Sequence, residues 1–264
     1  MLKTLQDIVV RNLPAPYCPL CQKKVALKKM ILCPLTSMSS RINGSSLSKN
    51  YIFTDIQAAY WMELKDSAVI KHYKRHETIY LSGDNADSVY LVCSGLVMLS
   101  RLQDHGVEIG QSVITPHCTF GELEVLNQIE REQQATALSD VELCVVPAQV
   151  FNILSKKSAR FSHNVAKLIS QRQRRSECRQ AYLACLEAPN RLAQLLLEIA
   201  HAIGNEDHRG RHFSPCLTHK DMATLIISSR ETVSTTMANF RRYKMIDFDR
   251  KHVSIINEQA LANY

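Results

Sequence analysis

Short apolar runs occupy residues 67–146 and predict a domain built from β-strands. The runs read TIYL, SVYLV, GLVMLS, EIGQSVI and ELCVV, and polar turn sequences such as SGDNAD and QDHG separate them. Short strands at a spacing of about ten residues are typical of an all-β roll or barrel. Gly83 and Gly95 lie in two of the turns, where glycine adopts positive φ at little cost.

The apolar pattern takes on a helical period at Pro147. Apolar residues keep helical spacing from there until Pro189, which predicts one long helical stretch. Residues 191–204 predict a second amphipathic helix, and the polar sequence NEDHRGRH behind it predicts a loop. Before the strands, residues 51–66 have apolar side chains four positions apart and predict a short amphipathic helix.

Residues 218–242, THKDMATLIISSRETVSTTMANFRR, predict two short helices joined by a tight turn. Thr218 and Asp221 are spaced like a capping box, with Asp in place of the usual Glu or Gln, so they predict the start of the first helix. Ser229 is a good N-cap for the second helix. This arrangement is typical of a helix-turn-helix motif, although a helical hairpin that packs on another part of the chain would have a similar pattern.

In a helix-turn-helix motif the second helix inserts in the major groove, and its first residues reach the base edges. Arg230, Glu231, Ser234 and Thr235 fall on the outer side of that helix. Arg binds guanine in bidentate fashion, Glu accepts a hydrogen bond from cytosine, and Ser is permissive. The residues suited to phosphate contacts are Arg241, Arg242 and Lys244.

Composition narrows the class of protein. The chain has 264 residues, of which 45% are hydrophobic and 22% are charged, as in soluble globular proteins. It contains no apolar run long enough for a membrane span, and its N-terminus does not read as a signal peptide, so we expect a cytoplasmic protein without membrane contact. The net charge of +7 arises in residues 1–50, which hold eight basic residues and one acidic residue, so overall charge does not by itself indicate nucleic acid.

The sequence SSRETVS resembles the recognition helix of the Crp/Fnr family, the cyclic-AMP receptor protein and fumarate-nitrate reductase regulators. Three further segments resemble the family in the right order. They are LSGDNADSVYLVCSGLVML in the strand region, FGELEVL at 120–126 and NRLAQLLLEIA at 190–200. Motifs in this order over about 160 residues make the resemblance specific.

The resemblance implies an α+β fold. Its parts are an N-terminal β-roll, which is a cupin-like jelly roll of the cyclic-nucleotide-binding type, a long dimerisation helix and a C-terminal winged helix-turn-helix. The corresponding segments are a basic, cysteine-containing extension at 1–50, a sensory roll at 51–146, the dimerisation helix at 147–188 and the DNA-binding domain at 189–264.

The resemblance also implies a transcription regulator that binds a palindromic operator in double-stranded DNA as a homodimer, with RNA polymerase as a partner. The rival class is an enzyme. The sequence has no G-x-S-x-G, P-loop, dinucleotide fingerprint or H-E-x-x-H motif, so we expect no catalytic site.

Two positions depart from the family pattern in the DNA-binding region. Family members commonly carry Gly in the turn where this chain has Ile227, so the turn is expected to be less tight. They also commonly carry Arg at the position of Thr235, which cannot make the bidentate guanine contact. Ser234 matches the serine of fumarate-nitrate-type regulators. The family half-site therefore does not carry over directly to this chain.

One candidate effector is a cyclic nucleotide, and the pocket implied by the resemblance contains Gly121, Glu122, Arg131 and Ser176. A cyclic phosphate needs backbone N–H groups and an Arg, and a carboxylate suits the ribose hydroxyl. The family has Arg-Ser where this chain has Arg131 followed by Glu132. A carboxylate there is expected to repel the phosphate.

A second candidate is a [4Fe–4S] cluster, which needs four thiolates. Oxygen-sensing family members use three N-terminal cysteines and a fourth in the roll. The corresponding residues here are Cys18, Cys21, Cys33 and Cys144, with Cys118 as a rival for the last position. Such a cluster would respond to oxygen or nitric oxide. The interval between the second and third cysteines is longer than in the family.

The same cysteines leave other interpretations open. Cys-Pro-Leu-Cys at 18–21 resembles a zinc knuckle, with Cys33 as a third ligand and Cys144, Cys118 or His117 as a fourth. A thiol redox switch without metal, a small-molecule effector, or no effector at all complete the alternatives.

The long helix suggests a hypothesis about the dimer. Val165, Leu168, Ile169, Leu183 and Leu186 are spaced like an apolar seam. Between them the sequence QRQRRSECRQ contributes further seam-like positions, which are Arg172, Arg175, Ser176 and Arg179. Like charges that face each other across a two-fold axis oppose association, which predicts a marginal dimer. Alternatively, these Arg side chains extend outward or pair with Glu177 and Glu187.

Overall fold

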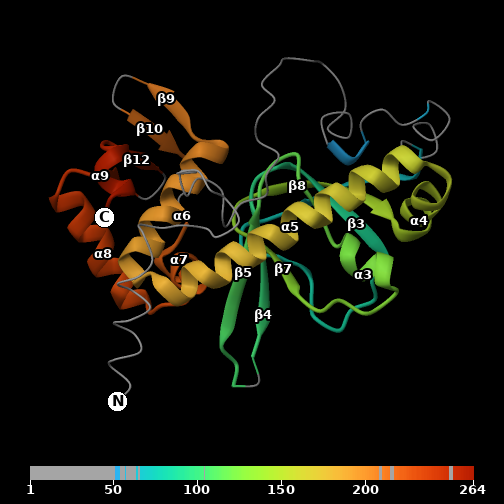
Figure 1. Ribbon diagram of the computed structural model, residues 1–264, viewed down its shortest axis with the longest axis horizontal. Coiled ribbons are helices and arrows are strands. Elements are labelled where there is room, and N and C mark those ends of the chain that lie inside the picture. The colour runs from blue at the N-terminus through green and yellow to red at the C-terminus, as the bar shows by residue number, and fades with distance from the viewer. Residues whose placement is uncertain are drawn as a thin grey trace.

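A computed structural model describes residues 51–53, 57, 64, 66–103, 105–207, 210–214, 217–249 and 252–264 (Figure 1). The predicted helix over 51–66 falls mostly outside these residues; at its start, Tyr51–Phe53 form the 3-10 helix η2. Cys18, Cys21 and Cys33 also lie outside them. Among the described residues, no helix is long and apolar enough to cross a membrane.

Eight strands form two four-stranded sheets that face each other as a roll. One sheet has the order β1-β8-β3-β6 and the other β2-β7-β4-β5. The strands are β1 (Val69–Tyr73), β2 (Thr78–Tyr80), β3 (Ser88–Ser94), β4 (Val97–Leu102), β5 (Glu108–Ile114), β6 (Thr119–Phe120), β7 (Gln134–Ala137) and β8 (Val141–Pro147). The predicted strand region is confirmed, and β1, β6 and β7 are strands that the apolar runs did not indicate.

Strands β3 and β4 are buried on the outer face of the roll as well as between its sheets. In β3, Tyr90 and Val92 point into the space between the sheets, whereas Val89 and Leu91 pack outward against helices. In β4, Met98 belongs to a core that continues into the C-terminal domain. Burial on both faces explains why these strands read as continuous apolar runs rather than as alternating ones.

The helical stretch that begins after Pro147 is two helices instead of the single one predicted. They are α4 (Ala148–Lys157) and α5 (Ala159–Cys185), and they follow the short helix α3 (Glu122–Asn127) of the roll. The backbone is extended at Ser158, whose side chain accepts a hydrogen bond from the Phe161 N–H and caps α5. A strong local N-cap therefore starts a new helix where the apolar period alone predicts continuation.

The C-terminal domain contains three consecutive helices and a small sheet. The helices are α6 (Ala188–Ile203), α7 (His219–Ile226) and α8 (Arg230–Arg242), with α9 (Glu258–Ala262) at the end. The sheet has the order β11-β12-β10-β9, with β9 (Asn205–Asp207), β10 (Gly210–Phe213), β11 (Ile246–Phe248) and β12 (Val253–Ile255). The prediction of a loop after α6 was wrong, because β9 and β10 pair there as a hairpin. Strand β10 also pairs with β12, which lies far away in the sequence.

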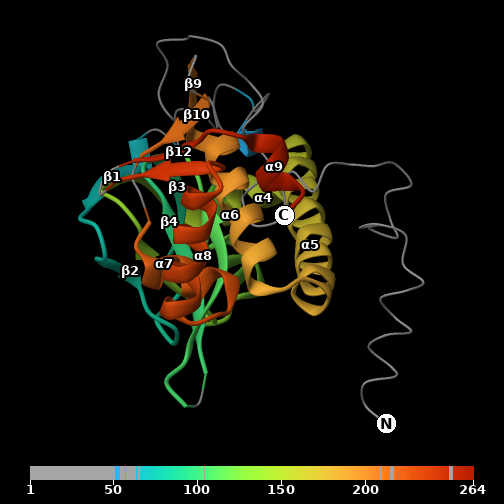
Figure 2. The same cartoon turned by 90° about the vertical axis from the view of Figure 1, so that its left-hand side faces the viewer.

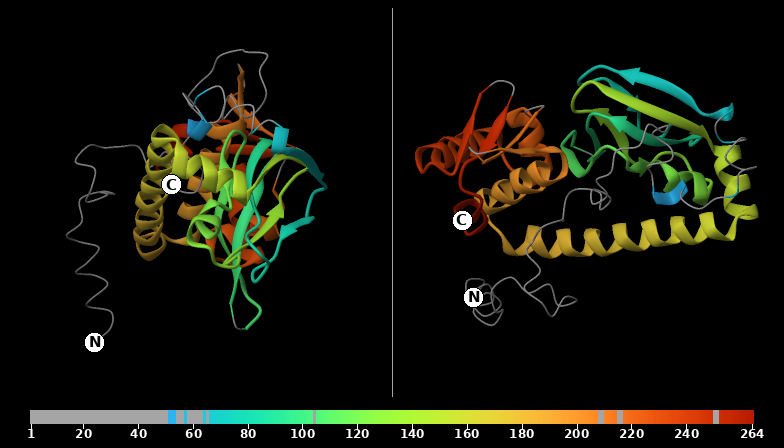
Figure 3. Two further views of the ribbon diagram at one scale, coloured as in Figure 1. Left: turned by 90° about the vertical axis from the view of Figure 1, so that its right-hand side faces the viewer. Right: turned by 90° about the horizontal axis from the view of Figure 1, so that it is seen from above.

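Helix α5 runs along both domains, as the right-hand view of Figure 3 shows. Its inner face packs against other parts of the same chain, since Val165 and Leu168 are buried in a core with the roll and α4. Arg172 and Arg179 also turn inward, toward Glu122 and toward Gly110. The prediction that these four residues form a dimer seam was therefore wrong, because their face of the helix meets the roll.

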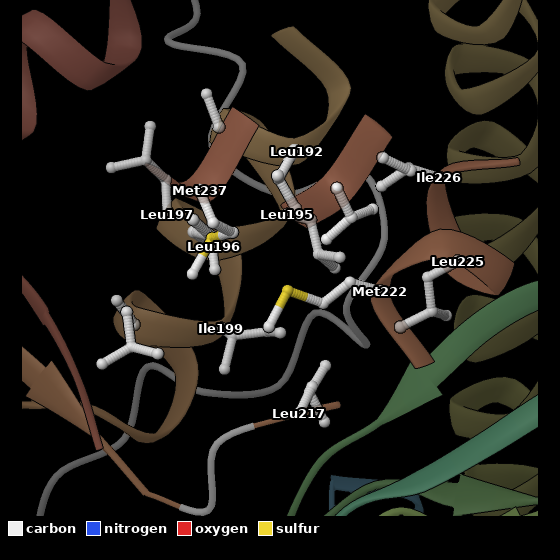
Figure 4. Close-up of a cluster of buried hydrophobic side chains, with 14 of the residues drawn as sticks. Leu192, Leu195, Leu196, Leu197, Ile199, Leu217, Met222, Leu225, Ile226 and Met237 are labelled. Carbon is white, nitrogen blue, oxygen red and sulfur yellow. The ribbon is translucent and has the colours of Figure 1, made fainter. Parts of the chain in front are cut away.

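Arg179 joins the two domains. Its guanidinium donates hydrogen bonds to the Gly110 carbonyl of β5 and to the Leu225 carbonyl of α7, each at 2.7 Å, and only 7% of the residue is exposed. A Cβ added at Gly110 would lie 3.0 Å from Leu225, so the strand and the helix are in close contact. Figure 4 shows Leu225 on the side of its cluster that faces the strands. Figure 2 shows α7 and α8 in front of the roll.

We predict that Arg179→Met lowers the free energy of unfolding by about 2–3 kcal/mol, because two buried carbonyls lose a charged donor while the aliphatic stem is kept. Urea unfolding followed by circular dichroism measures this. Arg174→Met, at an exposed position of the same helix, is the control and should change stability by no more than about 0.5 kcal/mol. Equal effects of the two substitutions would contradict the bridging role.

Candidate DNA-binding surface and effector pocket

The first helix of the motif begins at the predicted capping box. The Thr218 hydroxyl accepts a hydrogen bond from the Asp221 N–H at 3.0 Å, and the Asp221 carboxylate accepts one from the Thr218 N–H at 2.9 Å. Asp221 also lies near Arg75 of the roll, at 3.8 Å. The Thr218 hydroxyl thus orients α7, and its contribution to DNA binding stays a prediction.

The turn between the helices passes through Ile227, which has a φ of 53° and a ψ of 66°. This is the left-handed region, where a β-branched residue is strained and glycine is favoured. The turn is closed all the same, since the Ser228 N–H donates to the Ala223 carbonyl and Arg191 donates to the Ile227 carbonyl at 3.1 Å. The expectation of a looser turn was wrong, because Ile adopts the conformation that glycine would take.

Helix α8 presents the predicted base-reading residues to solvent. Val233, Met237 and Phe240 are fully buried and fix the helix against α6 and α7. The residues on the opposite side are all exposed, and they are Arg230, Glu231, Ser234 and Thr235. The spacing of apolar residues in the sequence therefore correctly predicts which face of α8 is buried and which is exposed.

The first turn of α8 is held by local hydrogen bonds. The Ser229 hydroxyl accepts a hydrogen bond from the Thr232 N–H at 3.1 Å, as predicted for the N-cap. The Glu231 backbone N–H and the Ser229 hydroxyl donate to the Glu231 carboxylate and hold its pKa below the ordinary value. Glu231 is therefore ionised at neutral pH and presents an acceptor at the exposed end of the helix.

Two predicted phosphate-contacting residues lie at the other end of α8. Arg241 pairs with Asp247 of β11 at 2.9 Å and lies over the Phe248 ring, 5.1 Å from its centre. Arg242 lies 5.0 Å from the centre of the Tyr243 ring. Both are exposed. Arg241 is thus oriented by the β11–β12 hairpin, whereas Arg242 is oriented by its neighbour.

The predicted effector pocket lies in the roll, around Arg131. This residue is only 2% exposed, and its guanidinium donates to the carbonyls of Gly121, at 2.7 Å, and Ser88, at 2.5 Å. It lies over the Tyr80 ring, 4.5 Å from the ring centre. Burial raises the pKa of Tyr80, and the negative charge of Glu124 raises it further.

Glu122 is fully buried and forms an ion pair with Arg172 of α5, which also donates to the Thr119 carbonyl. Gly121, Glu122 and Arg131 therefore come together as predicted. Ser176 instead lies on an exposed part of α5.

Sequence reasoning also chose the wrong carboxylate beside Arg131. The Glu132 side chain is exposed and pairs with Arg101 at 3.1 Å. The acid beside the Arg131 guanidinium is Glu124, with 6% exposure and 3.5 Å between the two charged groups. Glu132 lies in the bend that precedes β7, where its side chain faces solvent, and the repeated acid in Gly-Glu-Leu-Glu was the signal for residue 124.

Cys144 lies in β8, opposite Ile70 of β1 and Leu91 of β3. It is 2% exposed, and burial raises its pKa to about 12, with a smaller contribution from Cys93. These apolar surroundings favour the neutral thiol of Cys144, and its role as a metal ligand stays a prediction. Among the described residues, no three His, Cys, Asp or Glu side chains are grouped to hold a metal ion.

Residues 70–158 match the family model of the cyclic nucleotide-binding domain, and residues 190–264 match the Crp-like helix-turn-helix domain. A cyclic AMP receptor protein of Thermus thermophilus is 32% identical over 62% of this chain and 73% of its own length. A CRP-like cAMP-activated global transcriptional regulator of Mycobacterium tuberculosis is 25% identical over 82% of this chain and 96% of its own.

Solved structures agree with these matches. A CRP-family transcriptional regulator from Thermus thermophilus has a TM-score of 0.62 and 26% identity, covering 73% of this chain and 95% of that one. The roll and the exposed recognition helix define a two-domain, DNA-binding transcription regulator. The chain belongs to the Crp/Fnr family of such regulators. The relatives named above are regulators of transcription rather than enzymes.

We predict that Ile227→Gly raises the free energy of unfolding by about 1 kcal/mol, because it removes left-handed strain that exceeds the added chain entropy of glycine. The control is Ile256→Gly, at a 50% exposed isoleucine without positive φ, which should be destabilising. Thermal and urea unfolding of both variants are compared with the wild type. Destabilisation of equal size at the two sites would show that Ile227 is not strained.

Proposed function

We propose that this regulator reads a palindromic operator in double-stranded DNA as a homodimer, through the first turns of α8. The observation that carries the proposal is the exposed row of Arg230, Glu231, Ser234 and Thr235 on a helix whose opposite face is buried. Arg230 suits guanine, ionised Glu231 suits the amino group of cytosine, and the Thr235 methyl suits thymine. Arg241 and Arg242 suit the flanking phosphates.

The second half-site requires a second recognition helix one turn of DNA away, about 34–36 Å. Helix α5 supports a homodimer, because its outer side is free of the roll. Its exposed positions recur at helical spacing and several are small; they include Ala166, Ser170, Gln173, Ala181 and Ala184. Small residues allow two helices to approach closely. We place the dimer contact on this outer face and propose RNA polymerase as the partner of the bound dimer.

We further propose that the effector acts through the cysteine-containing extension, on the chemistry of Cys18, Cys21 and Cys33. Three thiols suit iron–sulfur or zinc binding, or a metal-free redox response. The burial of Cys144 between β1 and β3 argues against it as a fourth ligand in this arrangement. A small-molecule effector in the roll is the alternative.

We predict that Arg230→Ala lowers affinity for the preferred operator by about tenfold to a hundredfold and relaxes the preference at one base pair. Arg242→Ala should weaken specific and random duplexes alike and reduce the salt dependence by about one phosphate contact. Operator selection from random duplexes, followed by anisotropy titrations at several salt concentrations, measures both effects. Identical behaviour of the two variants would contradict base reading by Arg230, and failure of the wild type to retain DNA at low salt would overturn the proposal.

We predict that protein purified without oxygen carries iron and sulfide, or zinc, that depends on the N-terminal thiols. Absorption spectra and metal analysis are compared for the wild type, Cys18→Ser and Cys144→Ser. The first variant should lose the metal, and the second should keep it. Loss in both variants would make Cys144 a ligand, and a metal-free wild type would leave the redox or small-molecule alternatives.

A further inference from the structure

The side chain of Arg191 binds the turn of the helix-turn-helix to the end of α5. Arg191 lies near the start of α6 and is half-buried. Its guanidinium donates hydrogen bonds to the Leu183 carbonyl at 3.3 Å and to the Ile227 carbonyl at 3.1 Å. Leu183 lies in the last turn of α5, and Ile227 is the C-cap of α7. One side chain therefore connects the ends of two helices that are far apart in the sequence.

The end of α7 is a favourable place for a positive charge. Carbonyls at a helix C-terminus lack partners within the helix and carry partial negative charge, so a guanidinium stabilises them. Arg179 binds the same end of α7, through the Leu225 carbonyl at 2.7 Å. Two guanidinium groups, one from α5 and one from α6, thus hold the C-terminal end of α7. Neither belongs to the two helices of the helix-turn-helix itself.

The backbone of Arg191 is fixed as well. The hydroxyl of Tyr182 in α5, a residue with 4% exposure, donates a hydrogen bond to the Arg191 carbonyl at 3.0 Å. Burial lowers the pKa of Arg179, and the negative charge of Glu198 in α6 opposes this effect. Glu198 is itself only 2% exposed, so its charge offsets part of the cost of placing a guanidinium in this interior.

The turn leads directly into the recognition helix. Ser229, two residues after Ile227, caps α8, and Arg230 is the first residue of that helix. A displacement of the Ile227 carbonyl would therefore also displace the base-reading residues. Helix α5 carries the proposed dimer contact, so the distance between the two recognition helices of a dimer depends on how α7 and α8 are held on α5.

We infer that Arg191 is a positioning residue that sets the half-site spacing of the operator. It fixes the first turn of α8 relative to α5, whereas the base preference within each half-site comes from α8. The inference rests on the proposed function, since it needs a dimer that reads two half-sites. Operator selectivity then has two separable parts: Arg191 determines the spacing, and residues such as Arg230 determine the base sequence.

The first test measures the spacing preference of Arg191→Met. The selected operator is compared, in anisotropy titrations, with duplexes that have one or two base pairs added between the half-sites. The wild type should lose about tenfold to a hundredfold in affinity on the longer duplexes, because avidity is lost when both half-sites cannot be bound together. Arg191→Met should lose less than about threefold, because its recognition helices can adjust to the longer spacing. It should bind a duplex with a single half-site about as well as the wild type.

Two control variants separate spacing from base reading and from stability. Arg230→Ala should lose base preference and keep the spacing preference of the wild type. Ile255→Val, in the core of the same domain, should lower the thermal midpoint and also keep the spacing preference. A spacing preference of Arg191→Met as steep as that of the wild type, or an equal loss in Ile255→Val, would overturn the inference and leave the proposed function standing. A wild type that binds no DNA would instead overturn the proposed function, and this inference with it.

Hydrogen exchange tests the anchoring of the turn on the protein alone. Arg191→Met should increase amide exchange at Ser228 and Leu186, whose N–H groups close the ends of α7 and α5, and leave β3 unchanged. Unchanged exchange at both amides would overturn the anchoring. If Arg191→Met does not fold, Tyr182→Phe takes its place, because it removes only the hydroxyl that holds the Arg191 backbone. It should weaken the spacing preference in the same direction, and an unchanged preference would overturn the inference.

Discussion

The two hydrogen bonds of the Arg179 guanidinium hold the DNA-binding domain against the roll. This guanidinium on α5 donates one hydrogen bond to the Gly110 carbonyl in a strand of the roll. It donates the other to the Leu225 carbonyl in the last turn of α7. Carbonyls at a helix C-terminus lack partners within the helix and carry partial negative charge, so a buried Arg suits that end of α7. The apolar core then continues from β4 and β5 into α6, α7 and α8, and the orientation of the recognition helix depends on this contact.

Helix α5 contacts both Glu122 of the roll and the DNA-binding domain through one face. Arg172 and Arg179 are seven residues apart, which is two helical turns, so both point to the same side. The first contacts Glu122 beside α3, and the second contacts Gly110 and Leu225. A displacement of α5 would therefore disturb both contacts together. The opposite face remains exposed, where a second copy of the chain can pack without disturbing either contact.

Local signals in the sequence were sufficient for the helix-turn-helix. The capping box at Thr218, the N-cap at Ser229 and the exposed face of α8 all depend on residues three or four positions apart. Contacts between distant segments were not accessible in this way. The spacing of Arg172 and Arg179 gives their common face but not what that face meets, and the strand at 210–213 pairs with β12, about 40 residues away in the sequence. The short strands β6 and β7 lack the apolar pattern altogether.

Residues 52 and 53 pack against the first turns of α5. Ile52 and Phe53 belong to η2, and both are fully buried. The Phe53 ring lies 5.6 Å from that of Phe161 in the first turn of α5, and Asn164 donates to the Ile52 carbonyl at 3.5 Å. Because packed side chains resist independent movement, a displacement of residues 52 and 53 would also displace the start of α5. The start of α5 is therefore coupled to η2 by direct packing.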